Sequence, residues 1–143
     1  MNPLVMLRNL TPLILPVLLA ACNTQDAATM EPPLAGAAIG GPFELVDSTG
    51  KTVRWSDFDG KYRVLYFGYA YCPDICPMDV QRMMQGYATF KKEHPQLAAK
   101  VQPIFVTIDP ERDTPEVVGE FTSAFSDDLV GLTGTPEQID KAA

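Results

Sequence analysis

The sequence predicts an α/β domain, in which helices cross over between the strands of a sheet. Two apolar runs, residues 64–67 and 101–108, are typical of buried strands. Between them, apolar side chains recur at three- and four-residue steps, as on one face of a helix. Helix-start signals then alternate with a third apolar run. Such alternation of strand and helix patterns along one chain indicates an α/β sheet.

The composition is that of one globular domain. The chain has 143 residues, of which 46% are hydrophobic and 20% charged, and this length is sufficient for a hydrophobic core. The formal net charge is −7, and without a basic stripe to neutralise phosphates we expect no nucleic-acid partner. The single histidine excludes a His-rich metal site within the chain.

The amino-terminal residues predict an export signal. After Arg8 comes an uncharged, largely apolar run, residues 10–21, which is shorter than the ~20 apolar residues of a membrane span. A positive residue, a short apolar stretch and small residues before a cleavage site describe a signal peptide, residues 1–21. Its ending, Leu-Ala-Ala-Cys, resembles a bacterial lipobox, so we expect lipidation of Cys22. The alternative is an ordinary signal peptide that ends near a cysteine.

Residues 22–40 predict a flexible tether between this lipid and the folded domain, residues 41–143. They are small, polar and rich in proline. We therefore expect a membrane-anchored lipoprotein of the bacterial cell envelope, facing the periplasm or the cell exterior. In such a compartment Cys72 and Cys76 remain as a pair that is free to form a disulfide.

The first half of the domain predicts a β-hairpin, a helical turn, a strand and a helix. The hairpin comprises residues 43–53, with turn-forming residues in its middle. A short helical turn follows at residues 56–58. The unbroken apolar run 64–67 predicts a strand buried on both faces. The next helix should end near His94, because a proline follows it, and its apolar face, which is expected to pack in the core, comprises Val80, Met83, Met84, Tyr87 and Phe90.

The second half predicts two strands and two helices. Residues 101–108 and 129–132 are the apolar runs. Thr114 caps a helix that begins with proline, and residues 135–138, Thr-Pro-Glu-Gln, have the spacing of a capping box. The sequence stops five residues after that box, which predicts a domain that is incomplete at its carboxyl end.

The candidate site is a pair of cysteines in the stretch Cys-Pro-Asp-Ile-Cys-Pro, between a strand and a helix. Ligands bind at the carboxyl ends of strands in open α/β sheets. We expect Cys72 in the loop and Cys76 just before the helix, because Pro77 disfavours helical geometry at the residue preceding it. Unpaired amides at the helix start should stabilise a thiolate, the form that binds metals and attacks disulfides.

The spacing of Cys72 and Cys76 leaves three uses open: a structural disulfide, a redox pair or a metal clamp. Two soft sulfurs suit Cu(I) better than zinc, because structural zinc takes four ligands and the chain has no second cysteine pair or His cluster. A thioredoxin-type redox enzyme prefers two residues between its cysteines, and here there are three.

Two sequence motifs carry a resemblance to a known protein family. The first comprises residues 64–69 and 72–77, Val-Leu-Tyr-Phe-Gly-Tyr and Cys-Pro-Asp-Ile-Cys-Pro; the second is residues 106–116, Val-Thr-Ile-Asp-Pro-Glu-Arg-Asp-Thr-Pro-Glu. Together with Gly-Leu-Thr-Gly at 131–134, they resemble the SCO family, also called SenC, of thioredoxin-fold copper proteins in cytochrome oxidase assembly. The resemblance spans about residues 41–141.

The resemblance implies a thioredoxin-like fold, incomplete at its carboxyl end, in which Cys72 and Cys76 bind a copper ion or alternatively form a disulfide. The family's third copper ligand is a histidine near the carboxyl end, in a segment that this chain does not contain. His94 is no substitute, because it lies at the far end of the helix beginning beside Cys76, roughly 25 Å away at a rise of ~1.5 Å per residue.

The functional hypothesis is a membrane-tethered copper metallochaperone rather than a turnover enzyme. It would deliver copper to, or reduce the cysteines of, a respiratory oxidase copper site. The implied partners are the oxidase copper-site subunit and another copper chaperone or a thioredoxin-like reductant. The alternative is a thiol–disulfide oxidoreductase of the cell envelope that uses the same two cysteines. A tethered binding domain with a structural disulfide is the third hypothesis.

Four further residues near the cysteines have competing interpretations. For Asp74 we expect either a role in tuning the thiolates or a copper-transfer contact, or that of a turn-former between prolines. Asp109 and Asp113 follow a strand end, where loop and capping roles are expected. Met78 lies two residues from Cys76, and the sequence assigns it no role.

Overall fold

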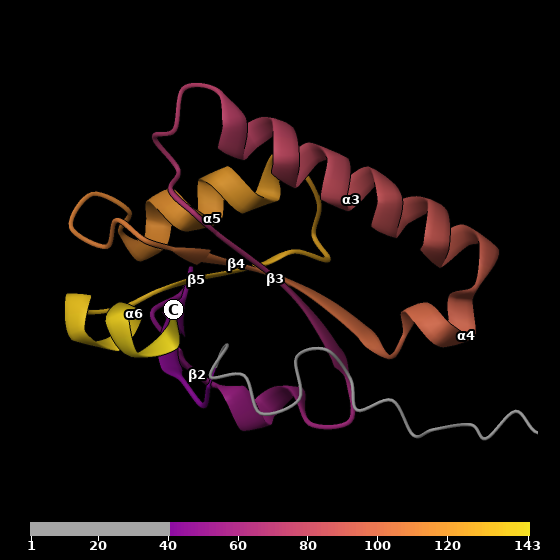
Figure 1. The fold of residues 1–143 in the computed structure, drawn as a ribbon, viewed down its shortest axis with the longest axis horizontal. Coiled ribbons are helices and arrows are strands. Elements are labelled where there is room, and N and C mark those ends of the chain that lie inside the picture. The colour runs from indigo at the N-terminus through magenta and orange to yellow at the C-terminus, as the bar shows by residue number, and fades with distance from the viewer. Residues whose placement is uncertain (1–40) are drawn as a thin grey trace, which may run out of the picture. The chain divides into compact units, whose positions relative to one another are not determined.

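The computed structural model describes residues 41–143. Within this range one five-stranded sheet, in the order β2-β1-β5-β4-β3, is covered by helices on both faces (Figure 1). The predicted signal peptide, the lipidation of Cys22 and the predicted tether lie outside the described residues. Among those described, no helix combines the length and the apolar character needed to cross a membrane.

Strands and helices alternate along residues 41–143 as the sequence predicts. The hairpin and a 3-10 helix come first, and helices then connect the parallel strands. One short helix, α4, is an element that the sequence patterns do not predict. The elements are β1 (Glu44–Asp47), β2 (Thr52–Arg54), η2 (Trp55–Phe58), β3 (Tyr62–Gly68), α3 (Ile75–Glu93), α4 (Pro95–Ala98), β4 (Val101–Thr107), α5 (Pro115–Ser123), β5 (Val130–Thr133) and α6 (Pro136–Ala142).

Strands β3, β4 and β5 run parallel, so their carboxyl ends meet at one edge of the sheet. The pairing of β3 with β4 extends from Tyr62 opposite Val101 to Gly68 opposite Thr107. Strand β4 pairs on its other side with β5, and β1 joins β5 antiparallel. The loops that follow Gly68 and Thr107 therefore lie next to each other, where open α/β sheets bind ligands.

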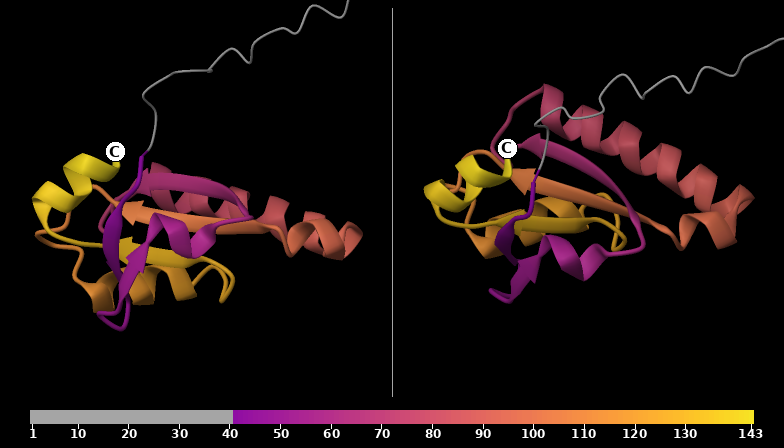
Figure 2. Two further views of the ribbon diagram at one scale, coloured as in Figure 1. Left: turned by 90° about the horizontal axis from the view of Figure 1, so that it is seen from below. Right: turned by 60° about the horizontal axis from the view of Figure 1, so that its bottom comes forward.

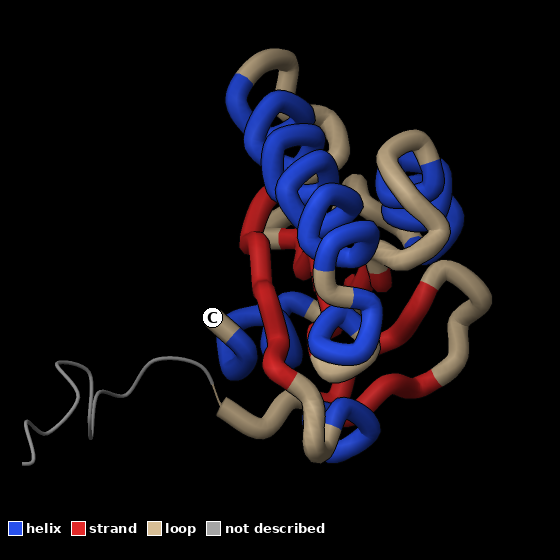
Figure 3. The backbone as a smooth tube through the Cα atoms, turned by 90° about the vertical axis from the view of Figure 1, so that its right-hand side faces the viewer, coloured by secondary structure: helices blue, strands red, loops and turns tan. Residues whose placement is uncertain are grey.

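Two hydrophobic cores lie on opposite faces of the sheet. One packs α3 and α5 against β4 around the fully buried Val80, Phe105 and Val118. The other packs η2 and α6 against the sheet around Ile104 and Leu132. Figures 2 and 3 show α3 and α6 on opposite sides of the strands. Because Phe105 and Ile104 are neighbours that point to opposite faces, β4 is the strand around which both cores are built.

The prediction that the strand of residues 64–67 is buried on both faces is wrong. In the described part of the chain, β3 is the last strand of the sheet and pairs with β4 alone. Leu65 and Phe67 contact one core and Tyr66 the other, yet Val64 remains 42% exposed and Tyr62 75% exposed. The apolar run therefore indicates that the side chains of β3 contact both cores. How deeply β3 is buried depends on its neighbouring strands, which a local sequence pattern does not reveal.

The predicted helix ends are confirmed. Helix α3 ends at Glu93, before the proline. The hydroxyl of Thr114 accepts a hydrogen bond from the N–H of Val117 at the start of α5. At the start of α6, Thr135 and Gln138 form the capping box. These contacts join residues three apart, so their geometry follows from the local sequence.

Candidate metal and redox site

The two cysteines meet at the carboxyl edge of the sheet. Cys72 lies in the loop after β3, and Cys76 lies in the first turn of α3. Both side chains are buried, with exposed fractions of 8% and 5%, and both are free thiols. The backbone N–H of Cys76 donates to Sγ of Cys72 over 3.4 Å. The pair predicted from the sequence is thus brought together in a site shielded from water.

The prediction that Cys76 precedes the helix is wrong. Helix α3 begins at Ile75, so Cys76 is its second residue and Pro77 its third. Proline is tolerated here because the first N–H groups of a helix have no partner within it, and no hydrogen bond is lost. The free N–H of Cys76 binds the sulfur of Cys72 instead. The helix start thereby supplies a donor to the site.

The environment of Cys72 favours its thiolate. Hydrogen bonds from the backbone N–H groups of Asp74 and then Cys76 lower the pKa of Cys72 to about 7. The Cys76 side chain and the Tyr69 hydroxyl contribute to the same lowering, and burial opposes it. Asp74 therefore acts through its amide, because its carboxylate is exposed and caps no N–H of α3. A thiol with a pKa near neutrality is both a better nucleophile and a better metal ligand at pH 7.

Two tyrosines flank the cysteines, one at each sulfur. Burial and a hydrogen bond with Cys76 raise the pKa of Tyr66, whose hydroxyl also donates to Asp79 Oδ2 over 3.4 Å. A hydrogen bond with Cys72 is the main reason that the pKa of Tyr69 is raised. Both phenols therefore stay protonated, and the Tyr69 hydroxyl donates to the Cys72 sulfur. Neither residue was recognised from the sequence as part of the site, although both lie in the motif of residues 64–69.

An ion pair covers the outer side of the cysteine loop. Arg112 donates from Nε to Asp109 Oδ2 over 2.6 Å. Its guanidinium lies 5.9 Å from the ring centre of Tyr69 and 5.6 Å from that of Tyr71, distances suited to cation–π contact. The expected loop role of Asp109 is therefore accompanied by a charged contact that reaches the aromatic rings beside Cys72.

Asp113 does not have the capping role that the sequence analysis considered for it. The cap of α5 is Thr114, and Asp113 is fully buried. Its Oδ2 accepts hydrogen bonds from the N–H of Ala70 over 2.7 Å and from the hydroxyl of Thr107 over 2.6 Å. The signal missed in the sequence is that Asp113 ends a tight loop after a buried strand, which turns its side chain back toward that strand.

No third ligand joins the cysteines within residues 41–143. This part of the chain contains no group of three or more His, Cys, Asp or Glu side chains placed to hold a metal ion. His94 lies at the carboxyl cap of α3, where its ring centre is 5.5 Å from that of Phe90. The whole length of α3 separates it from Cys76.

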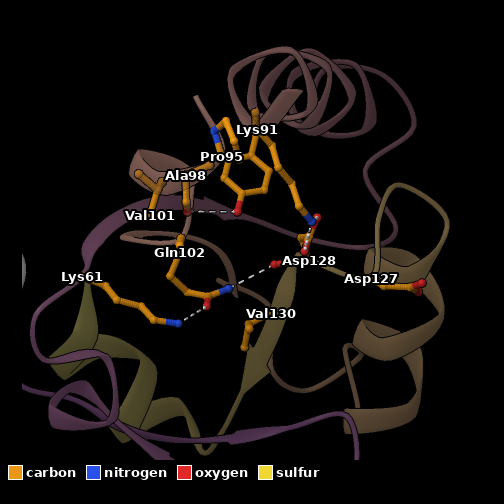
Figure 4. A pocket seen from close by; sticks show the side chains of 11 residues that line it. Lys61, Lys91, Pro95, Ala98, Val101, Gln102, Asp127, Asp128 and Val130 are labelled. Atoms are coloured by element: carbon orange, nitrogen blue, oxygen red, sulfur yellow. Dashed lines mark hydrogen bonds and ion pairs between the residues drawn. The ribbon is translucent and has the colours of Figure 1, made fainter. Parts of the chain in front are cut away.

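A cavity of about 430 Å³ lies at the other end of the parallel strands. Figure 4 shows that its side chains form a polar chain across the opening. Lys61 donates to Gln102, Gln102 donates to the backbone carbonyl of Asp128, and Lys91 forms an ion pair with the Asp128 carboxylate. Lys61 and Lys91 are exposed, in contrast to the buried Cys72, Cys76 and Asp113 at the opposite edge.

Comparison with known proteins adds a family to this geometry. The SCO1/SenC family model matches residues 31–143. Protein SenC of Rhodobacter capsulatus is 46% identical over 108 residues, 76% of this chain and 47% of that protein. The mitochondrial SCO1 homolog 1 of Arabidopsis thaliana is 43% identical over 122 residues, 85% of this chain and 36% of that protein. The chain thus spans between a third and a half of the length of these relatives.

Solved structures with the same fold include two copper-bound proteins. Arabidopsis thaliana ScoI with copper bound has a TM-score of 0.68 and 42% identity, covering 74% of this chain and 64% of that one. Bradyrhizobium japonicum ScoI with copper bound has a TM-score of 0.66 and 41% identity, covering 73% and 64%. The α/β, thioredoxin-like fold class that the sequence predicts is confirmed.

Proposed function

The chain belongs to the SCO1/SenC family, and on that premise we propose that it binds Cu(I) through Cys72 and Cys76 as a copper metallochaperone. The observation that carries this proposal is the buried pair itself, in which the N–H of Cys76 reaches Sγ of Cys72 over 3.4 Å. Copper is the cargo in this role, and the protein supplies thiolates that receive it and release it.

The donor set fits Cu(I) better than the other common metals. Thiolates are soft ligands that select Cu(I), zinc or iron–sulfur clusters. Structural zinc and iron–sulfur sites take four ligands, and residues 41–143 offer the two cysteines without a third partner. The copper-bound ScoI structures of Arabidopsis thaliana and Bradyrhizobium japonicum support the same metal.

The residues around the pair have separate tasks in this proposal. The amides of Asp74 and Cys76 stabilise the Cys72 thiolate, so that this residue is substantially ionised at pH 7 before metal arrives. The Tyr69 hydroxyl donates to the Cys72 sulfur, and the Tyr66 hydroxyl lies beside Cys76. Burial of both side chains limits the access of water, which would compete with the thiolates for the metal.

The partner and location of the chain are part of the proposal. A structural neighbour, BsSco, is described as a member of the Sco family of cytochrome c oxidase assembly proteins. We infer that this chain likewise serves a respiratory oxidase copper site, with another copper chaperone or a thioredoxin-like reductant upstream. A SCO1/SenC family lipoprotein from Bacillus anthracis is a structural neighbour, which supports lipidation of Cys22 and an envelope location.

Thiol–disulfide exchange is the second candidate function, and the low pKa of Cys72 favours it. The Cys72 thiolate would attack a disulfide of the partner, and Cys76 would then displace the partner's sulfur. Two electrons and two protons pass to the partner, which leaves as a dithiol, and Cys72 and Cys76 end as a disulfide. The disulfide switch identified in BsSco supports this chemistry.

Competitive Cu(I) titration of the chain tests the copper function. The wild-type protein should bind one Cu(I), with sulfur scattering in X-ray absorption. Cys72→Ser and Cys76→Ser should each weaken binding at least about a hundredfold, because one thiolate is a poor site for a soft ion. His94→Ala, at the far end of α3, is the matched control and should bind like wild type. Equal affinity in either serine variant would refute the assignment of the ligands.

A further inference from the structure

We propose that Asp113 is a positioning residue that holds the cysteine loop in its thiol geometry and thereby sets the equilibrium between dithiol and disulfide. This role rests on the thiol–disulfide chemistry proposed above, and it does not depend on copper. The Asp113 carboxylate is buried, and it makes no contact with the sulfur of Cys72 or of Cys76 in the structure.

The contacts of Asp113 reach the carboxyl ends of all three parallel strands. Its Oδ2 accepts from the N–H of Ala70, two residues beyond β3, and from the hydroxyl of Thr107, the last residue of β4. Its backbone carbonyl accepts from the hydroxyl of Thr133, the last residue of β5, over 2.8 Å. One residue therefore fixes the positions of three strand ends relative to one another.

We call the three hydrogen bonds accepted by Asp113 the Asp113 clamp. Its bond with the N–H of Ala70 ties it directly to the cysteine loop. Ala70 is two residues before Cys72, whose own N–H donates to the carbonyl of Tyr69 over 3.2 Å. Residues 69–72 thus form a short turn with one fixed point at Asp113. If Cys72 changes its position, either the whole turn moves with it or the hydrogen bond from Ala70 to Asp113 breaks.

The burial of Asp113 argues against a role as a mere loop former. The residue is fully buried, and its Oδ1 has no hydrogen-bond partner among the described residues. A buried carboxylate with one oxygen left without a partner lowers stability compared with a fully satisfied one. Such a group persists where its geometry is needed, and the group that it orients is the loop of Cys72.

Disulfide formation should strain this clamp. The two sulfurs must approach to about 2.05 Å with a restricted torsion angle, whereas the structure shows free thiols with the clamp closed. Removing the clamp should therefore destabilise the dithiol form more than the disulfide form. With oxidised glutathione as electron acceptor, the two thiols give up two electrons and two protons, form one S–S bond and release two reduced glutathione molecules.

The test equilibrates the metal-free chain with glutathione buffers and measures the disulfide fraction by thiol alkylation. Asp113→Ala should shift the equilibrium about tenfold toward the disulfide, which corresponds to a midpoint potential about 30 mV lower. Asp113→Asn keeps an oxygen acceptor and should restore most of the wild-type equilibrium. Val118→Ala, a cavity variant in the core of α5, is the control: its melting temperature should fall equally in both redox states.

Hydrogen exchange of the wild-type protein provides a measurement that needs no variant. The Ala70 amide should be protected at least about fivefold more in the dithiol form than in the disulfide form. Equal protection, or an Asp113→Ala equilibrium that matches wild type while the melting temperature falls equally in both states, would overturn the positioning role. If Asp113→Ala shifts the equilibrium as expected but the wild-type pair binds no Cu(I), the copper function alone would be refuted.

Discussion

The two ends of the parallel strands carry similar residue types in different physical settings. At the amino end, the Lys91–Asp128 ion pair beside the cavity is solvent-exposed, with 52% and 39% of the side chains accessible. At the carboxyl end, Asp113 is fully buried and bonded to a backbone N–H and a hydroxyl. An aspartate exposed to water contributes little when paired, whereas a buried one is costly to leave unpaired. Burial therefore distinguishes the aspartate at the edge with the cysteines from the aspartate at the opposite edge, although the residue type is the same.

The largest expected effect on stability is at the buried carboxylate. Asp113→Ala should lower the free energy of unfolding of the dithiol form by about 2–4 kcal/mol, because the N–H of Ala70 and the hydroxyl of Thr107 lose their acceptor in the protein interior. Urea unfolding measured with a reductant checks this. A change below about 1 kcal/mol would mean that the two ends of the strands are energetically alike.

A second substitution adds a methyl group at the carboxyl end of β3, on the same edge of the sheet. In Gly68→Ala, the new methyl group would lie 2.6 Å from Cε1 of Tyr66 and 3.2 Å from Cε2 of Phe105. We expect a loss of about 1–3 kcal/mol from overpacking and a displaced Tyr66 hydroxyl. Gly86→Ala, where nothing lies within 4 Å of the added methyl, is the control and should not destabilise the protein. Chemical denaturation of both variants makes the comparison.

The pKa of Cys72 predicts a pH dependence at the carboxyl edge. Alkylation of Cys72 by iodoacetamide should rise with pH around a midpoint near 7, because the thiolate reacts. Tyr69→Phe removes a hydrogen bond that lowers this pKa, so the rate at pH 7 should fall about twofold to fivefold. An unchanged rate would mean that the tyrosine hydroxyl does not donate to the sulfur.

The lowered pKa of Cys72 also predicts the direction in which the stability of the fold changes with pH. The folded pKa, about 7, lies below the ordinary value of about 8.5, so the unfolded chain binds more protons between these two values. The stabilisation from the thiolate is complete above the unfolded pKa and is lost as the pH falls through the folded pKa. Thermal unfolding of wild type and Cys72→Ser between pH 6 and 9 should show that difference, and parallel curves would contradict it.

The smallest effect is expected at the amino end. Lys91→Ala removes the ion pair with Asp128 at the cavity in Figure 4. Because the pair is exposed, the melting temperature should fall by less than about 4 °C, and the loss should shrink further in high salt. Differential scanning calorimetry at two salt concentrations measures this. A larger fall in the melting temperature that does not depend on salt would show that the Lys91–Asp128 pair is important for the stability of the fold.

The parts of the fold that the sequence predicted are those that depend on neighbours in the chain. The caps at Thr114 and Thr135 and the hairpin of residues 43–53 involve short-range contacts, and each was predicted correctly. The exposure of β3 could not be predicted, because it depends on which strand pairs with which. The start of α3 was misjudged by two residues, because Pro77 is equally compatible with the first and third helical positions.

The same division applies to the site. Cys72 and Cys76 are four residues apart, and their spacing was sufficient to nominate them. The amides and the Tyr69 hydroxyl that act on Cys72 are also local, whereas Asp113 comes from a loop 43 residues beyond Ala70. Asp113 meets the cysteine loop only through the parallel pairing of β3 and β4, which one sequence does not specify.

This difference in sequence separation has a consequence for folding. The two cysteines can encounter each other as soon as their short loop is made, since closing a loop of a few residues takes nanoseconds. The contact of Asp113 with Ala70 spans 43 residues and must await the crossover helix and β4, because long-range contacts form late. A nascent chain therefore presents its thiols to oxidants before the carboxylate is in place, and the order of oxidation and folding decides which form of the pair the finished sheet encloses.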